Sequence, residues 1–315
     1  MLGQRSKTAS PSGPPIEPPT TPHPPRFNLE IKPSVKPTNL LPWLVPALSL
    51  VSGCSAPESG ASKSAATATP GSARPVHWAY EGEASPKHWG HLSPAYAACD
   101  HKSGQSPIDI TRAGAGSPNP VQLNYSSTSL RIAHHEHVID IVDNGHTIQV
   151  TVDEGSTLTT AKDNYQLKQF HFHTPSEHTI DGRHYPMEVH FVHQSAAGNF
   201  AVASALFVEG PANDNLAKLI AHFPQAKGDS LHLPDEKLDL AVHLPANAPA
   251  YTYVGSFTTP PCTENVEWFV FRDPITASPE QLKAFADRLH HNNRPVQSTA
   301  GRPVRAATIA GSTQP

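Results

Sequence analysis

The chain of 315 residues has little of what marks several common classes of protein. Positive charge is not in excess, because 23 Lys and Arg stand against 27 Asp and Glu, so the charge gives no reason to expect a nucleic-acid partner. A long apolar segment is missing too: the run of residues 40–51 is too short and too interrupted by proline for a transmembrane helix. No internal repeat is evident. The apolar share of 37% suffices for one sizeable domain and for no more than two.

The first 75 residues hold a large share of the 34 prolines. Residues 1–34 predict a disordered Pro-rich extension that cannot bury enough apolar surface to fold. Residues 35–54 have the basic flank and the apolar core of a secretory signal peptide. Because such an extension is unusual in front of a signal peptide, we hypothesise that translation starts near Val35. Residues 55–75 are rich in small residues and predict a flexible linker.

The signal segment ends in Val51-Ser-Gly-Cys54. This resembles the lipobox of bacterial lipoproteins, in which the cysteine carries a lipid. An ordinary cleaved signal peptide, in which Cys54 has no role, is the alternative. The sequence therefore predicts an exported, periplasmic protein, and the lipobox favours membrane attachment through Cys54.

Cysteine is scarce, and a total of three is odd for an exported protein. If Cys54 carries lipid, Cys99 and Cys262 remain as a pair, and an oxidising compartment allows them to form a disulfide. In the chain-entropy model, a bridge over so long a loop contributes roughly 4–5 kcal/mol to the free energy of unfolding. Two unrelated buried thiols are the alternative.

From residue 76 onward, short apolar segments alternate with turn residues, which is typical of a mainly β domain with short surface helices. The expected strands are residues 138–142, 146–152, 165–172, 189–192, 200–208 and 266–271. Asp143-Asn-Gly145 predicts a hairpin turn between the first two. Helical spacing predicts one helix over residues 213–222 and another after Ser278, where Pro279 and Gln281 complete a capping box. We expect the domain to span residues 76–305 and residues 306–315 to form a disordered tail.

Three histidines inside the predicted strands suggest a metal site. His171 and His173 are two residues apart, so their side chains project from one face of a strand, and Glu188 and His190 repeat this spacing. Three neutral imidazoles favour zinc, with one coordination position open for water. The spacing of these histidines around Glu177 is also that of cupins, which bind iron or manganese and in which Glu177 would be a ligand. These residues alone leave both interpretations open.

Other motifs of the chain resemble those of the α-class carbonic anhydrases. They occur in the family's order, from His77-Trp-x-Tyr80 to about Arg305, and cover essentially the whole folded part: Gln105-Ser-Pro-Ile-Asp109, Asn144-Gly-His146, Gly255-Ser-Phe-Thr-Thr-Pro-Pro261 and Asn292-Asn-Arg-Pro295. The short Thr-Pro-Ser link between His173 and Glu177 is similar to the bacterial branch. The resemblance implies a large, twisted, mostly antiparallel central sheet. It also implies zinc-dependent, reversible hydration of carbon dioxide to bicarbonate and a proton.

The resemblance implies a zinc site and the residues that orient its ligands. The ligands would be His171, His173 and His190. Gln169 would orient the first of them, a backbone carbonyl near Asn292 the second, and Glu188 the third. Such partners fix the ring tautomers and tune the metal.

In the family, zinc-bound hydroxide attacks carbon dioxide. By resemblance, Thr258 would orient this nucleophile and donate its own proton to Glu177. His146 occupies the family's proton-shuttle position, which suits a side chain that titrates near neutrality. Tyr80 and Gln149 would order the intervening water molecules.

Carbon dioxide is uncharged, so its pocket should be apolar. The resemblance implies a wall of Val192, Val202, Phe257, Val266 and Trp268, with Thr259 as a hydrogen-bonding residue for bicarbonate. Phe257 departs from the leucine common in the family, and its ring is expected to narrow the entrance. A monomer or a homodimer is expected. A catalytically inactive binding module is the remaining alternative, although the three histidines, Thr258 and Glu177 are all present.

Overall fold

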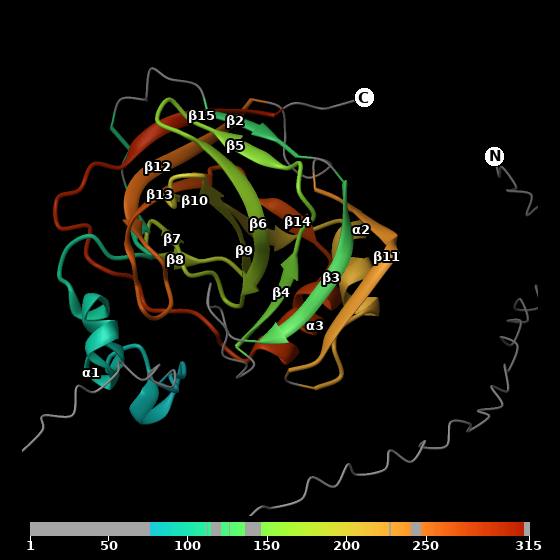
Figure 1. The fold of residues 1–315 in the computed structure, drawn as a ribbon, viewed down its shortest axis with the longest axis horizontal. Helices are drawn as coiled ribbons and strands as arrows, with labels where there is room; N and C mark the ends of the chain where they lie inside the picture. Colours follow the sequence, from blue (N-terminus) through green and yellow to red (C-terminus); the bar gives the residue numbers. More distant parts are fainter. Residues whose placement is uncertain are drawn as a thin grey trace, which may run out of the picture. The chain divides into compact units, whose positions relative to one another are not determined.

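The computed structural model describes residues 76–111, 113–114, 121–125, 127–135, 146–226, 228–240 and 247–311. The predictions for residues 1–75, for the strand at 138–142 and for the turn at 143–145 lie outside these residues. Figure 1 shows that the described chain is mostly strand with a few short helices, as the sequence predicts. Within this part of the chain, no helix is long and apolar enough to cross a membrane.

Among the described residues, twelve strands form one twisted sheet. Its strands are β2 (Val121–Asn124), β3 (Ser127–His135), β4 (Thr147–Thr151), β5 (Thr157–Thr159), β6 (Asn164–His173), β9 (Met187–Ser195), β10 (Phe200–Glu209), β11 (Ser230–Asp239), β12 (Ala248–Ser256), β13 (Glu264–Phe271), β14 (Ile275–Ala277) and β15 (Arg305–Gly311). Most neighbours are antiparallel. The exceptions are β10, which runs parallel to β13 and β14, and β15, which runs parallel to β2.

Strand β9 lies between β6 and β10 and pairs with both. Through these pairs the hydrogen-bonded order runs from β6 through β5, β2, β15, β12, β13, β10 and β9 back to β6. The central strands β9 and β10 are buried along nearly their whole length, and β10 is accordingly an almost continuous apolar run. Polar side chains on β9 therefore lie in the interior, and each needs a partner there.

A second, small sheet consists of β1 (Asp109–Ile110), β7 (Thr179–Ile180) and β8 (Arg183–His184). The N-terminal part of the domain forms η1 (Gly82–Ala84), α1 (Trp89–Leu92) and η2 (Pro94–Asp100). The two predicted helices are α2 (Asp214–Ala221) and α3 (Pro279–Leu289), and α3 has the capping box that the sequence predicts. The Gln281 amide of this box also exchanges two hydrogen bonds with the Asn213 main chain, which joins the start of α3 to that of α2.

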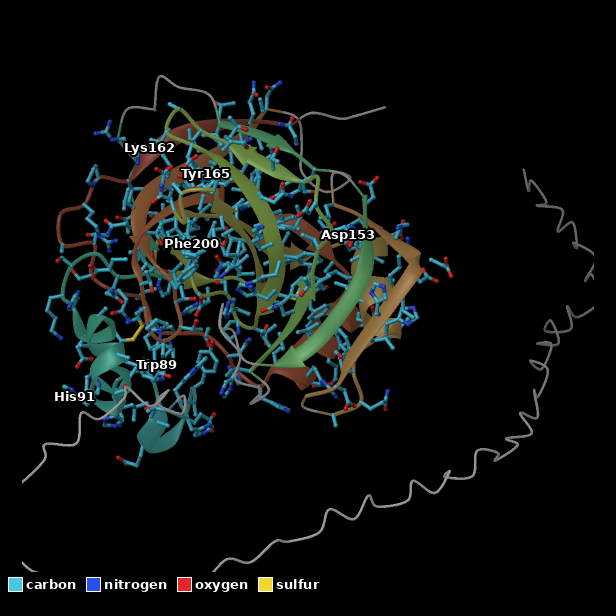
Figure 2. The ribbon with its side chains drawn as sticks, viewed as in Figure 1. Trp89, His91, Asp153, Lys162, Tyr165 and Phe200 are labelled. Atoms are coloured by element: carbon cyan, nitrogen blue, oxygen red, sulfur yellow. A yellow bond between two sulfur atoms is a disulfide. The ribbon has the colours of Figure 1, made fainter. Side chains whose placement is uncertain are left out.

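The apolar residues of the domain form three buried clusters. The largest lies between the sheet and helices α2 and α3, where the rings of Phe172 and Phe285 pack 4.6 Å apart. A second lies over β9, β10 and β13. The third surrounds the disulfide of Cys99 and Cys262, which the sequence predicts and the structure contains. In Figure 2 the disulfide is the yellow bond close to Trp89.

One prediction about strands is wrong. Residues 305–311, most of which we expected in a disordered tail, form β15, because their backbone hydrogen bonds join β12 to β2. Strand β4 pairs with β3 on one edge and with β6 on the other.

Candidate active site

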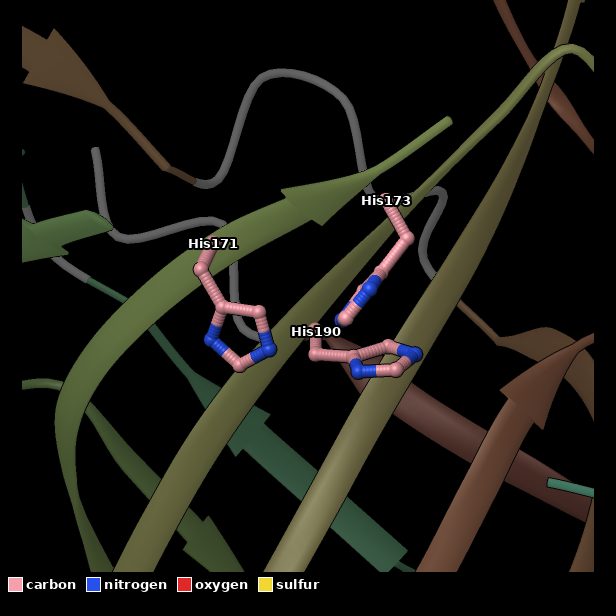
Figure 3. A group of neighbouring side chains, drawn as sticks. All are labelled: His171, His173 and His190. Atoms are coloured by element: carbon pink, nitrogen blue, oxygen red, sulfur yellow. The ribbon is translucent and has the colours of Figure 1, made fainter. Parts of the chain in front are cut away.

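Three histidine side chains come together on the neighbouring strands β6 and β9. The register of these antiparallel strands places His171 opposite His190, and His173 lies on the same face two residues later. In Figure 3 the three rings point toward one another, and their centroids are 5.2, 5.2 and 4.6 Å apart. All three side chains are buried, and one nitrogen of each lies within 4.8 Å of the others.

Each ring uses one nitrogen for a hydrogen bond to an acceptor beside the cluster. The pairs are His171 Nδ1 with Gln169 Oε1 at 2.7 Å, His173 Nδ1 with the main-chain oxygen of Asn292 at 2.7 Å, and His190 Nε2 with Glu188 Oε1 at 2.9 Å. An acceptor holds the proton on the nitrogen that it faces, so the other nitrogen of each ring carries the lone pair. Three lone pairs are therefore available to one metal ion.

Burial keeps these rings in the form that binds metal. Desolvation lowers the pKa of His173 to about 3, and positive charge on His190 would act in the same direction. Desolvation also lowers the pKa of His190, although the carboxylate of Glu188 partly offsets it. A metal ligand must be deprotonated, so the folded chain has both histidines ready at neutral pH.

Glu188 is fully buried and is surrounded by donors. It accepts from the backbone N–H groups of Glu177 and His178, both at 2.8 Å, from His178 Nδ1 at 2.7 Å and from the hydroxyl of Ser204. Burial alone would raise its pKa, but nearby positive charge and the hydrogen bonds of His178 and His190 hold the pKa well below its ordinary value. Glu188 is therefore a fixed negative charge behind His190.

Glu177 lies between the histidine cluster and a loop. Its Oε1 accepts the backbone N–H of Arg294 at 2.8 Å, and its Oε2 lies 3.5 Å from Nε2 of His173 and 3.9 Å from Nδ1 of His190. Burial raises the pKa of this carboxyl well above its ordinary value, while a hydrogen bond with the Thr258 side chain acts in the opposite direction. Within the described residues, the compact group of ligand atoms contains the three histidines and not Glu177.

Residues Thr258 and Thr259 follow β12 in a loop, and both side chains are nearly buried. The N–H of Cys262 donates to the Thr259 oxygen at 2.8 Å, which closes a turn beside the disulfide. At the end of β12, Trp268 donates its indole N–H to the Ser256 oxygen at 3.0 Å. The loop that presents the threonines is thus held on both sides.

The apolar residues that the sequence assigns to a substrate pocket belong to one cluster. Val192, Val202, Val266 and Trp268 are buried within it, and Phe257 packs against it with partial exposure. The rings of Trp268 and His190 lie 4.9 Å apart, so the cluster adjoins the histidines. The ring of Phe200, which the sequence analysis did not single out, lies 4.9 Å from that of Phe257.

His146 lies just before β4, and its ring stacks on Trp78 with centroids 4.5 Å apart. Its Nε2 is 3.0 Å from the main-chain oxygen of Trp78, and the Tyr80 ring lies 5.6 Å away, edge to face. Gln149, on β4, stands opposite His171 on β6. The three residues expected to carry or order the proton path therefore lie on two different segments.

Known proteins are similar to this chain in both sequence and fold. The family model described as eukaryotic-type carbonic anhydrase matches residues 84–308, most of the described chain. This chain belongs to the α-class carbonic anhydrases.

Individual relatives agree with this family. A carbonic anhydrase of Pectobacterium atrosepticum is 40% identical over 234 residues, which cover 72% of this chain and 89% of the relative. One of Nostoc sp. is 39% identical over 246 residues, covering 78% and 91% respectively. The solved α-carbonic anhydrase of Thermovibrio ammonificans, in complex with the inhibitor sulfanilamide, has 40% sequence identity and a TM-score of 0.66 over 73% of this chain and 99% of that one. By enzyme class, this chain is a carbonic anhydrase.

For a carbonic anhydrase, the donor set of the cluster fits zinc. Zinc accepts imidazole nitrogen in a tetrahedral arrangement, and a catalytic site keeps one position open. Three buried, neutral rings with fixed outer nitrogens meet this requirement. A second compact group consists of His178, Glu188 and His190. Its atoms are already joined by hydrogen bonds, so in this carbonic anhydrase it is a network and not a second metal site.

Sequence reasoning missed the role of Arg294, although it quoted the Asn292-Asn-Arg-Pro295 motif. The guanidinium is buried and donates to Gln105 Oε1 at 2.9 Å, to the Ser106 oxygen at 2.7 Å and to the Cys99 oxygen at 2.8 Å. The backbone N–H of Arg294 also donates to Glu177. Arg294 therefore connects the disulfide region with the histidine cluster.

A chain of buried hydrogen bonds behind Glu188 was missed as well. His178 Nε2 lies 2.7 Å from the Tyr253 hydroxyl, which in turn lies 2.9 Å from Ser106 Oγ. The position of His178, directly after the motif that ends in Glu177, was the available signal in the sequence. It could not identify Tyr253 and Ser106 as partners, because they come from β12 and from the segment before β1.

Proposed function

We propose that this carbonic anhydrase catalyses the zinc-dependent, reversible hydration of carbon dioxide to bicarbonate and a proton. The arrangement of His171, His173 and His190, each with its outer nitrogen bonded to an acceptor, carries the proposal. These three residues would hold the ion through the nitrogens that face the centre of the cluster. Bound zinc supplies a Lewis acid that makes water nucleophilic near neutral pH, an effect for which this family is the best-known example.

Thr258 and Glu177 would position the nucleophile. The Thr258 side chain shares a hydrogen bond with the carboxyl of Glu177, and Oε1 of this carboxyl accepts the N–H of Arg294. With its own proton directed at Glu177, the Thr258 oxygen would be available to accept a hydrogen bond from the nucleophile. Thr258 would in this way orient the nucleophile toward the substrate, and correct orientation of this kind lowers the barrier to reaction.

The apolar cluster next to His190 suits carbon dioxide. Val192, Val202, Val266 and Trp268 offer no hydrogen bond that would hold the charged product more tightly than the neutral substrate. Thr259, at the start of the turn beside the disulfide, supplies a polar group for bicarbonate. The neighbouring rings of Phe200 and Phe257 narrow the apolar side of the site.

His146 would take the proton of the reaction to the solvent, with Tyr80 and Gln149 ordering the water molecules between. Imidazole exchanges protons near neutrality, which is what this step requires. The ring of His146 stacks on Trp78, which belongs to the apolar cluster around the disulfide, and it is only partly buried.

The disulfide of Cys99 and Cys262 supports export, since such bonds persist in oxidising compartments. We therefore propose a periplasmic enzyme, attached to the membrane through lipidated Cys54 and acting as a monomer or homodimer. Mass spectrometry of the protein isolated from membranes tests the lipid. An unmodified Cys54, or cleavage elsewhere, would contradict the anchor.

Stopped-flow measurement of carbon dioxide hydration by the purified protein tests the proposed function. We expect activity that a zinc chelator removes and added zinc restores, with one zinc per chain by elemental analysis. Iron or manganese in place of zinc, without hydration activity, would favour a cupin-like site with Glu177 as a ligand. A zinc-loaded protein without activity would favour a binding module.

A further inference from the structure

We propose that a cavity beside Arg294 binds a phosphate monoester, at a site separate from the histidine cluster. The cavity has a volume of about 540 Å³, in the range of sites for small molecules. Its lining residues come from the segments 86–105 and 294–298, and none of the three cluster histidines is among them. The observation that carries the proposal is a buried guanidinium in the wall of this cavity, bonded to neutral oxygens alone among the described residues.

The guanidinium of Arg294 is only partly satisfied by the protein. Nη1 donates to Gln105 and Ser106 and Nη2 donates to the Cys99 oxygen, so three of its N–H groups are used. Nε is buried and has no hydrogen-bond partner among the described residues. The ring of Trp89, whose centroid lies 5.5 Å from the guanidinium carbon, is a weaker partner. Arg294 therefore keeps donor capacity in the part of the chain that the structure describes.

Burial of this cation is costly because no carboxylate of the described chain forms an ion pair with it. Desolvation lowers the pKa of Arg294 to about 10, and the charges of Glu177, Tyr80 and Asp100 act in the opposite direction. The guanidinium remains a cation at neutral pH. An anion that reaches it from the cavity would offset part of the cost of desolvation.

Two lysines add positive charge to the same cavity. Lys87 and Lys102 are exposed, and neither forms a hydrogen bond or an ion pair with a described residue. Asp100 is the one carboxylate among the described lining residues, and it pairs with His91 at 3.2 Å. With Arg294, three cations thus stand against one carboxylate, although the whole chain has a net charge of −4.

This charge selects the class of ligand. A phosphate monoester carries about −1.5 to −2 at neutral pH, which matches the excess of two positive charges, whereas a single carboxylate would leave one cation unbalanced. Phosphate oxygens accept from guanidinium and from ammonium groups. The remaining lining histidine, His101, already pairs with Glu264 at 3.0 Å. Because the cavity is larger than a phosphate group, we expect the phosphate to be attached to a small organic group.

The walls of the cavity are held in place by the protein itself. The disulfide joins Cys99 to Cys262, and Gln105 Nε2 donates to the Cys262 oxygen at 3.3 Å. The N–H of Gln297 donates to the Pro107 oxygen at 2.7 Å, which connects the two lining segments. A site with fixed walls loses little conformational entropy when a ligand binds.

Isothermal titration of the zinc-loaded protein with glycerol 3-phosphate tests the site. We expect one molecule per chain with a dissociation constant below about 1 mM, and no binding of glycerol at that concentration. The double variant Lys87→Ala/Lys102→Ala should weaken binding at least about tenfold, because two charge-assisted contacts are lost. Both side chains are exposed, so we expect the variant to fold and to hydrate carbon dioxide like the wild type.

Lys168→Ala/Lys237→Ala is the matched control. It removes the same charge from two exposed lysines outside the cavity and should leave the affinity unchanged. An equal loss of affinity in both double variants would show a general effect of net charge and would overturn the site. Full affinity in Lys87→Ala/Lys102→Ala would place the bound phosphate elsewhere, for example at the metal, and would overturn it too.

A phosphate monoester can also be the headgroup of a lipid, and vesicles distinguish this source from a soluble molecule. The probes are phosphatidylcholine vesicles that contain either phosphatidic acid, a monoester, or phosphatidylglycerol, a diester. Flotation with phosphatidic acid alone, lost in Lys87→Ala/Lys102→Ala, would assign the site to a lipid. Equal flotation with both lipids would indicate a nonspecific anionic surface. Binding of neither glycerol 3-phosphate nor phosphatidic acid vesicles would overturn the proposal.

Backbone amide NMR signals locate the bound molecule. Glycerol 3-phosphate should shift the signals of Lys102 and Gln297, which line the cavity, and leave those of His171 and His190 in place. Shifts confined to the two histidines would identify a metal-bound phosphate and contradict the site.

The site and the proposed function can fail separately. A protein that hydrates carbon dioxide but binds neither probe would overturn the site and leave the proposed function standing. A protein that binds glycerol 3-phosphate through Lys87 and Lys102 but lacks hydration activity would keep the site and overturn the proposed function.

Discussion

The main-chain oxygen of Asn292 accepts the Nδ1 proton of His173 at 2.7 Å, and this bond fixes the tautomer of a candidate metal ligand. The side chain of Asn292 does more. Its amide nitrogen donates to the main-chain oxygens of His146 at 2.9 Å and Phe172 at 2.8 Å, and its amide oxygen accepts the N–H of Thr174 at 2.9 Å. One buried residue after α3 therefore joins the metal-site strand to the segment of the proposed proton shuttle.

Asn292→Ala should destabilise the protein by about 2–4 kcal/mol, because the buried N–H of Thr174 loses its acceptor and the main-chain oxygens of His146 and Phe172 each lose a donor. Urea unfolding followed by fluorescence measures the change. Asn293→Ala, at the adjacent and less buried residue, is the control and should cost far less. Equal stability of the two variants would show that these hydrogen bonds contribute little.

His190→Ala should abolish zinc binding and hydration activity together, since two imidazoles and water do not retain zinc tightly. Zinc content after dialysis and stopped-flow hydration give the two readouts, and far-UV circular dichroism checks the fold. An active variant that contains no zinc would refute the role of His190 as a ligand.

Glu188→Gln should lower zinc affinity by about 10–100-fold, because a neutral amide replaces the fixed charge behind His190 and cannot accept all the donors around it. Competition with a chromophoric chelator measures the affinity. Glu209→Gln, a carboxylate at the exposed end of β10, provides the comparison and should retain wild-type affinity. Unchanged affinity of Glu188→Gln would assign Glu188 a purely structural role.

Stability should fall in acid partly because of His193, which lies outside the proposed reaction. Burial lowers its pKa to about 3 from 6.5, with backbone hydrogen bonds partly offsetting the effect. Between these two values the unfolded chain binds a proton that the folded chain does not. The contribution of neutral His193 to the free energy of unfolding is therefore fully present above pH 6.5 and is lost as the pH falls toward 3.

His193→Gln should reduce the slope of unfolding free energy against pH in that window by at most about 1.4 kcal/mol per pH unit. Urea denaturation at several pH values between 7 and 4 provides the slope. The substitution also removes the partner of the Tyr125 hydroxyl, so a lower stability at all pH values is expected beside it. His91→Gln, at an exposed position, should leave the slope unchanged. The same slope for His193→Gln and the wild type would show that His193 does not contribute to the loss of stability in acid.

Several elements could be predicted from local sequence because their determinants are local. The capping box of Ser278 and Gln281 specifies the start of α3 through hydrogen bonds within one turn. The two-residue spacing of His171 and His173 gives a shared face on any strand. Strand β15 shows the limit of this reasoning. Its seven residues end the described chain, and only pairing with β12 and β2 makes them a strand.

By itself, the sequence determined the strand-rich class of the domain, the shared face of His171 and His173 and, through resemblance, the family. The resemblance also implied that Glu188 is the partner of His190, in agreement with their hydrogen bond. Contacts that no motif implied depend on the tertiary structure, because distances between segments far apart in the chain exist only in the folded protein. Examples are the N–H of Arg294 against Glu177 and the ring of His77 beside that of His146.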